Sequence, residues 1–527
     1  MIRNRFLFLL LIFFLNDCLL NPLIQELFWH PSKKNKLDLF LVAFSQLSHT
    51  FSYSPSVYVF IKGVPITPLS PASSSHFYNC SSSPNLPEGL HLDSSSCVIT
   101  GTPSSLIEDT TYSISAIGSL GSVSTNINIT VRGLNTYKFS SSTDRTGNTN
   151  INCSIQDESS GIGPYSFNVP YEEDVLVTLT SNLRGPPAAW PTGGGDLNTI
   201  QIRLYIDGVL QQRLVDGRYY HQDTAMGSAF ITTMTKGNHV IELRFCGNNT
   251  YYPFILGIYP TIITITSLVS SPYFDQNFSY KLPIGITNFA SSASFTNIMN
   301  GTEAMSLTYN ASNSILLWQS FALAGGAGIY GLTENYRLFP ETTEDVNHGV
   351  DSYSPINFVT YHELGASTTR TVNAQYSGVS TSNVVTYANY DNTLNLIGFK
   401  TPAAGNFGKA VINSLVQTTS ATFAPLTTIY ITNSYDAKYL ISFSANNAQG
   451  NSAGDSGCIF GLSINGGSVI AQTLVDNDAG GSLRNATIIT IETIPSGTIP
   501  VVIQFKEFAP TSGCNVNNAV FTIIPLE

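Results

Sequence analysis

The run Thr125-Asn-Ile-Asn-Ile-Thr-Val131 alternates polar and apolar residues, and the run Tyr58-Val-Phe-Ile61 is rich in β-branched and aromatic side chains. Such patterns are typical of strands that bury one face in a core and leave the other in water. Turn-forming residues lie between the two runs, namely Pro65, Pro68, Pro71, Gly89, Gly101 and Pro103. This part of the chain is therefore predicted to fold as a sandwich of short β-strands.

Five short motifs in the same region carry a resemblance to a known family. In chain order they are Phe51-Ser-Tyr-Ser-Pro55, Gly63-Val-Pro-Ile-Thr-Pro68, Leu86-Pro-Glu-Gly-Leu90, Ile99-Thr-Gly-Thr-Pro103 and Tyr112-Ser-Ile-Ser-Ala116. Through these motifs and their order, residues 50–132 resemble the bacterial putative Ig domain of surface proteins. The resemblance implies an Ig-like, cadherin-like sandwich in which Gly89 and Gly101 form tight turns. It assigns no chemistry to the motifs.

The relation of that family to cadherin-like domains raises calcium as a candidate ligand. Calcium takes about 6–8 oxygen ligands, usually from several carboxylates on converging loops. The acidic residues in this region are Glu88, Asp93, Glu108 and Asp109, and they form no regularly spaced acidic motif. We therefore expect no cofactor and no metal site.

The rest of the chain repeats one pattern three times, with a period of about 130 residues. Two sets of anchors carry this period: Leu204, Leu332 and Leu462, then Phe245, Tyr376 and Phe505. Asp207-Gly208 and Asn465-Gly466 are strong signals for type I′ hairpins, whereas the middle copy has Asn335-Tyr336 there. We expect three tandem sandwich domains, at residues 134–269, 275–400 and 409–527.

These units resemble jelly-roll sandwiches of the C1q/TNF-like kind. The resemblance rests on Tyr439-Leu-Ile-Ser-Phe-Ser444 followed by Phe460-Gly-Leu-Ser-Ile-Asn-Gly466. The predicted fold class is thus all-β, an Ig-like sandwich followed by three jelly-roll-type sandwiches. Because domains of that kind assemble as trimers, the resemblance implies an intramolecular pseudo-trimer of the three repeats. A row of separate domains is the alternative.

The composition narrows the class of protein. Charged residues make up 11% of the 527 residues, against roughly a quarter in an average protein. The net charge of −11 argues against a nucleic acid partner, which needs a basic surface. Apolar residues make up 43%, which excludes a disordered chain. Together these features favour an all-β surface protein.

The N-terminus has the pattern of an export signal. Two arginines precede the apolar run Phe6–Leu15, which is shorter than the roughly 20 residues of a spanning helix. The cysteine that follows makes residues 1–18 resemble a bacterial lipoprotein signal with Cys18 as the lipid carrier. Asp17 departs from the usual small residue, as in the relaxed signals of spirochaete lipoproteins. A plain cleaved signal is the alternative, and residues 19–49 would form a tether.

Seven cysteines occur in the chain. Once Cys18 is set aside for the lipid, six remain that can pair in an oxidising compartment. Grouping by domain favours the disulfide bonds Cys80–Cys97, Cys153–Cys246 and Cys458–Cys514.

One loop stands out as a candidate for binding. Residues 185–195 of the first repeat are rich in glycine and proline and carry Trp190. Exposed loops of this kind often contact partners. A tryptophan packed beneath its own loop is the alternative.

No catalytic residues are predicted. Gly454-Asp-Ser-Gly457 resembles the nucleophile turn of serine proteases, but the chain has no matching histidine motif, and Cys458 replaces the expected glycine. We expect an exported, lipid-anchored protein of the bacterial outer membrane or cell surface. Its expected role is non-catalytic adhesion or binding of a host matrix protein or glycan. The alternative is a structural envelope or appendage component that assembles through its jelly-roll domains.

Overall fold

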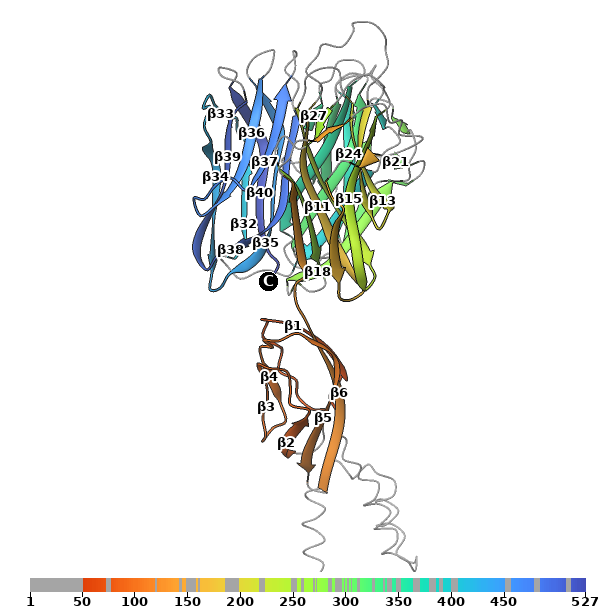
Figure 1. Ribbon diagram of the computed structural model, residues 1–527, viewed down its shortest axis with the longest axis vertical. Coiled ribbons are helices and arrows are strands. Elements are labelled where there is room, and N and C mark those ends of the chain that lie inside the picture. The colour runs from red at the N-terminus through yellow and green to blue at the C-terminus, as the bar shows by residue number, and fades with distance from the viewer. Residues whose placement is uncertain are drawn as a thin grey trace, which may run out of the picture. The chain divides into compact units, whose positions relative to one another are not determined.

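The computed structural model describes residues 51–527, apart from residues 148–157 and 185–198 and shorter stretches between strands. The described residues form strands and turns without a helix, so the predicted all-β class is confirmed. Accordingly, this part of the chain contains no helix that could cross a membrane. The chain divides into two compact units, residues 1–132 and 133–527 (Figure 1).

The first unit holds an Ig-like sandwich. Its strands are β1 (Val57–Ile61), β2 (Tyr78–Ser83), β3 (Leu90–Leu92), β4 (Ile99–Gly101), β5 (Ile107–Gly118) and β6 (Gly121–Arg132). The larger sheet has the order β1-β6-β5-β2, with β1 parallel to β6, and β3 pairs with β4 in a second, small sheet. Ile127, Ile129 and Val131 of β6 are fully buried, as their alternation with polar residues predicts.

The second unit contains three pairs of sheets. The first pair uses β7 (Thr136–Ser141), β10 (Tyr165–Val169), β11 (Glu173–Arg184), β12 (Thr199–Ile206), β13 (Val209–Gly217), β14 (Asp223–Met234), β15 (Gly237–Gly247) and β17 (Thr261–Ser267). One sheet has the order β7-β17-β11-β14 and the other β10-β15-β12-β13. The first strand therefore lies beside the last, which is the strand order of a jelly roll.

The second pair follows the same scheme. Its main strands are β18 (Phe274–Leu282), β23 (Ser306–Tyr309), β24 (Asn313–Ala324), β25 (Gly328–Glu334), β26 (Arg337–Leu338), β28 (Ser352–Glu363), β29 (Arg370–Gly378) and β31 (Asn392–Phe399). They form the orders β18-β31-β24-β28 and β23-β29-β25-β26.

The third pair repeats the scheme once more. Its strands are β32 (Gly408–Ile412), β34 (Ala424–Asn433), β35 (Ala437–Gly450), β36 (Ser456–Ile464), β37 (Ala471–Asn477), β38 (Arg484–Ile494), β39 (Gly497–Glu507) and β40 (Cys514–Pro525). They form the orders β32-β40-β35-β38 and β34-β39-β36-β37. We call the three pairs the first, second and third sandwich, and in each the inner sheet is the one that holds the first and last strands.

Further short strands are β8 (Arg145–Gly147), β9 (Glu158–Ser159), β16 (Phe254–Leu256), β19 (Thr287–Phe289), β20 (Thr296–Asn297), β21 (Met299–Asn300), β22 (Glu303–Ala304), β27 (Glu344–Val346), β30 (Val385–Tyr387) and β33 (Val416–Thr418). They extend these sheets, apart from β21 and β22, which pair with each other in a separate two-stranded sheet.

The predicted hairpin turns are present in the first and third sandwiches. Asp207 and Gly208 have φ angles of 52° and 74°, and Asn465 and Gly466 have 55° and 67°. Two successive positive φ angles define a type I′ turn, so the prediction from these two dipeptides is confirmed. Asn335 and Tyr336 of the middle copy lie outside the described residues.

The third and the first sandwich each enclose a core between their two sheets. In the third, Phe443, Phe460 and Phe521 meet at its centre with almost no exposed surface. In the first, Val177, Leu204 and Leu243 do the same. Their side chains point between the two sheets, so the sheets pack face to face.

A further buried cluster joins the inner sheets of all three sandwiches, and we call it the shared cluster. Its members are Leu176, Ala229 and Leu268 from the first sandwich, Ile397 and Phe399 from the second, and Leu440, Ile489, Ile491, Ile524 and Leu526 from the third. Phe399 ends the last strand of its sandwich, and Leu268 and Leu526 directly follow the last strands of theirs. The second face of each contributing sheet is therefore also buried at this point.

Candidate binding surface

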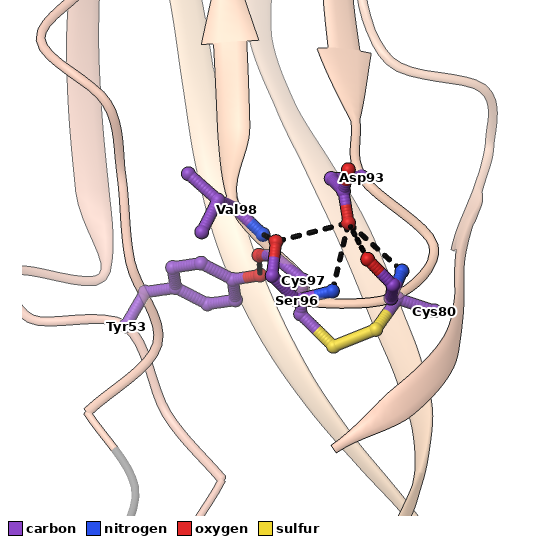
Figure 2. The surroundings of a disulfide bond; sticks show 7 residues. Tyr53, Cys80, Asp93, Ser96, Cys97 and Val98 are labelled. Atoms are coloured by element: carbon purple, nitrogen blue, oxygen red, sulfur yellow. Dashed lines mark hydrogen bonds between the residues drawn. A yellow bond between two sulfur atoms is a disulfide. The ribbon is translucent and has the colours of Figure 1, made fainter. Parts of the chain in front are cut away.

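A disulfide bond fixes one corner of the Ig-like unit. Cys80 of β2 is bonded to Cys97, which precedes β4, with their Cα atoms 5.4 Å apart. The hydroxyl of Tyr53 donates to the carbonyl oxygen of Cys97 at 2.5 Å (Figure 2). Burial raises the pKa of Tyr53, so its hydroxyl stays protonated and can donate at any ordinary pH.

The loop next to this disulfide is organised by Asp93. One oxygen of its carboxylate accepts hydrogen bonds from the hydroxyl and the backbone N–H of Ser95, at 2.6 and 2.9 Å. The same oxygen accepts from the backbone N–H and the hydroxyl of Ser96, at 2.8 and 2.9 Å (Figure 2). These bonds, led by the Ser95 hydroxyl, hold the pKa of Asp93 well below its usual range. The result is a rigid, exposed and polar loop.

Calcium was the ligand that the sequence raised for this domain. The bonded oxygen of Asp93 already serves the hydrogen bonds of its own loop. Across the part of the chain that the structure describes, no three His, Cys, Asp or Glu side chains lie together in a way that could hold a metal ion.

The third sandwich carries a second disulfide. Cys458 of β36 is bonded to Cys514 of β40, with their Cα atoms 5.0 Å apart, and neither side chain is exposed. This bond links the two sheets of the sandwich. Cys246 is also disulfide-bonded, and its expected partner, Cys153, lies outside the described residues. Cys18 and Trp190 lie outside them as well.

Exposed apolar side chains mark a candidate binding surface on the Ig-like unit. Val57 and Val59 of β1 are 57% and 49% exposed, whereas Tyr58 between them is buried. The two valines therefore project from the same face of an edge strand. Tyr78 is also more than half exposed, but it belongs to β2, at the opposite edge of the sheet from β1. Val57 and Val59 therefore form a short apolar strip by themselves, and we take this strip as the candidate contact surface.

One polar group in the first sandwich was not predicted from the sequence. The Nδ1 atom of His239 lies 2.6 Å from the Asp207 carboxylate, and its Nε2 atom lies 2.8 Å from the carbonyl oxygen of Thr235. Burial alone would lower the pKa of His239, but the hydrogen bonds to Asp207 and Thr235 raise it above its ordinary value. The ring therefore ties the β12–β13 turn to the β14–β15 turn.

The comparison with protein families identifies one part of the chain. Residues 48–132 match the family described as Putative Ig domain. This match covers the Ig-like sandwich and supports the resemblance seen in its sequence motifs. No curated protein matches the chain.

The similar solved structures share little sequence identity with the chain and have low TM-scores. An insecticidal delta-endotoxin from Bacillus thuringiensis shares 9% identity over 68% of this chain and 54% of its own, with a TM-score of 0.17. The protein SGBP-B of a Bacteroides ovatus mixed-linkage glucan utilization locus, solved with a mixed-linkage heptasaccharide, shares 11% identity over 40% and 52%, with a TM-score of 0.13. An ICAM-5 ectodomain fragment shares 11% identity over 85% of this chain and 99% of its own, with a TM-score of 0.16.

The chain spans about half the length of the first two of these structures. TM-scores this low give no basis for transferring a function.

Proposed function

We propose that the protein is exported and acts outside the cytosol as a non-catalytic adhesion or ligand-binding protein. The observation that carries this proposal is the distribution of its disulfides. Cys80–Cys97 lies in the first unit, and Cys458–Cys514 and the bonded Cys246 lie in the second. Disulfides form and persist in oxidising compartments and are rare in the cytosol. Bonds in both units therefore favour an extracellular or envelope location.

The place of action is the bacterial outer membrane or cell surface, through a lipid on Cys18. The apolar run before Cys18 supports this anchor, and acyl chains on one residue are sufficient for stable attachment. The partners in this proposal are the membrane on one side and a host matrix protein or glycan on the other.

The binding surface of the proposal is the outward face of β1. Val57 and Val59 expose apolar surface there, next to the half-buried Asn128 of β6, with which Val57 is paired. An apolar strip beside an amide group suits a ligand with both apolar and hydrogen-bonding faces.

A glycan and matrix-protein array tests this function with residues 50–527. The double substitution Val57→Ser and Val59→Ser removes the apolar strip. The matched control is Val209→Ser, because Val209 is 61% exposed but belongs to the first sandwich. Binding that survives in the control and falls in the double variant supports the proposal. Absence of binding to every ligand on the array, or turnover of a glycan, contradicts it.

A structural role in the envelope is the second candidate. It requires free sandwich faces through which copies of the chain assemble. We place it second because the inner sheets already bury residues of all three sandwiches against one another within one chain. Sedimentation of the protein without its lipid separates the two roles, since a structural component forms ordered assemblies and a binding protein does not.

A further inference from the structure

The free edge of the third sandwich is covered by a side chain of the first. β38 is the last strand of its sheet, so its outward N–H and C=O groups have no neighbouring strand. The hydroxyl of Thr180, on β11, accepts from the N–H of Ile489 and donates to its carbonyl oxygen, both at 2.9 Å. One side chain thus replaces a missing strand, which satisfies the backbone and blocks further pairing.

The neighbouring edge is covered in the same way. β37 is the last strand of the outer sheet of the third sandwich. The side-chain oxygen of Asn182 accepts from the N–H of Leu474 at 2.9 Å, and its amide nitrogen donates to the carbonyl oxygen of Gln472 at 3.3 Å. Thr180 and Asn182 both lie on β11, so one face of the first sandwich covers both edges of the third.

The edge of the first sandwich is covered by the second. The buried amide nitrogen of Asn395, on β31, donates to the carbonyl oxygen of Ala229 on β14 at 3.1 Å. Ala229 and Ile489 occupy equivalent positions, because Ala229 pairs with Thr178 and Ile489 pairs with Ser442. Thr178 and Ser442 occupy equivalent positions as well, because the hydroxyl of each is hydrogen-bonded to a threonine hydroxyl on the last strand. The partner is Thr264 for Thr178 and Thr522 for Ser442.

The remaining edge belongs to β28 of the second sandwich. This strand lies against β35, β38 and β40 of the third sandwich. The position on β28 that corresponds to Ile489 is Val359, because Val359 pairs with Leu317 and Leu317 pairs with Asn395. On the facing sandwich, the position that corresponds to Thr180 is Ser444, two residues beyond Ser442, and Ser444 is fully buried.

We infer that the three sandwiches close into a ring within one chain, in which each covers the sheet edge of the next, and that Ser444 binds the main chain of Val359. The partner of each edge is then the hydroxyl- or amide-bearing inner face of another sandwich of the same chain. The shared cluster fits a ring, since all three sandwiches reach one buried point there. In an open row, the first and third would have no reason to touch.

Amide hydrogen exchange in the full chain tests this inference. Thr180→Val keeps the shape of the side chain and removes its hydroxyl, so exchange at the Ile489 N–H is expected to rise about tenfold. Ser444→Ala is expected to raise exchange at the Val359 N–H by a similar factor. Ser444→Thr, which keeps a hydroxyl, is expected to restore protection. Thr432→Val is the control, because Thr432 is exposed and its hydroxyl faces Thr498 on the outer sheet.

Two outcomes of this experiment would overturn the inference. If Ser444→Ala leaves exchange at Val359 unchanged while Thr180→Val exposes Ile489, the second and third sandwiches do not meet at this edge and the ring is overturned. If the Thr432→Val control raises exchange at both edges, the effect is not specific to the covering side chains, and the inference fails as well.

Discussion

Asp207 and His239 lie on different hairpins of the first sandwich, yet the carboxylate of one is 2.6 Å from the ring of the other. Asp207 also accepts from the backbone N–H of Val240 at 2.8 Å. The first residue of the β12–β13 turn therefore holds the start of β15 through both side chain and backbone. The third sandwich has Asn465 at the corresponding position, so it lacks the charge.

This pair makes the stability of the first sandwich depend on pH. The pKa of His239 is raised in the folded chain, so its contribution is fully present below about pH 6.5, the ordinary value. That contribution is lost as the pH rises through the raised value. We expect Asp207→Asn, which copies Asn465 and keeps the turn, to lower the pKa of His239. An NMR titration of the His239 ring measures this pKa. An unchanged pKa in the variant would show that Asp207 does not raise the pKa of His239.

Gly89 and Gly101 are expected to tolerate no side chain. A Cβ atom on Gly89 would lie 2.0 Å from the carbonyl oxygen of Thr102, and one on Gly101 would lie 2.2 Å from that of Gly89. Gly63 also has a positive φ, of 81°, but has open space around it. Gly63→Ala should therefore cost only backbone strain, about 1–2 kcal/mol. Gly89→Ala should cost clearly more, and equal midpoints in urea for the two variants would refute the clash.

The two described disulfide bonds should differ in how much they stabilise the folded chain. Cys80 and Cys97 are separated by 17 residues, and Cys458 and Cys514 by 56. In the chain-entropy model these loops correspond to about 3 and about 4 kcal/mol of stability. Replacing each pair by alanine should thus destabilise the third sandwich slightly more than the Ig-like unit. Denaturant unfolding of the two double variants gives the comparison, and a reversed order would contradict it.

Cys18 gives a prediction on location. Cys18→Ala should release the protein from membranes, because the lipid of the proposed anchor is attached through that sulfur. Detergent partitioning of cell fractions measures the effect. An unmodified peptide that spans Asp17, Cys18 and Leu19 in the mature protein would rule out the anchor.

Local patterns predicted much of this fold. The Ig-like sandwich follows from its turn residues and from alternation in runs such as Thr125–Val131, because both signals act within a few residues. The hairpins at Asp207-Gly208 and Asn465-Gly466 follow for the same reason. Equivalent strand positions in the three sandwiches follow from the period of about 130 residues, since Leu204, Leu332 and Leu462 lie on the equivalent strands β12, β25 and β36.

The faces between the sandwiches could not be predicted in this way. Thr178 and Thr180 alternate with Val177 and Leu179, which is the pattern of a strand with one face in water. Both threonines are nevertheless fully buried, because another sandwich covers them. Thr180 and Ile489 are 309 residues apart, and no local signal links them. The role of His239 was missed for the same reason, since its partner is on another hairpin.

The central claim is that residues 134–527 form one closed body rather than a row of domains. Small-angle X-ray scattering on this segment tests it directly, because the radius of gyration differs between the two shapes. A closed body of this length should give about 21 Å. A row of three separate sandwiches should exceed about 30 Å, and a value in that range would contradict the ring.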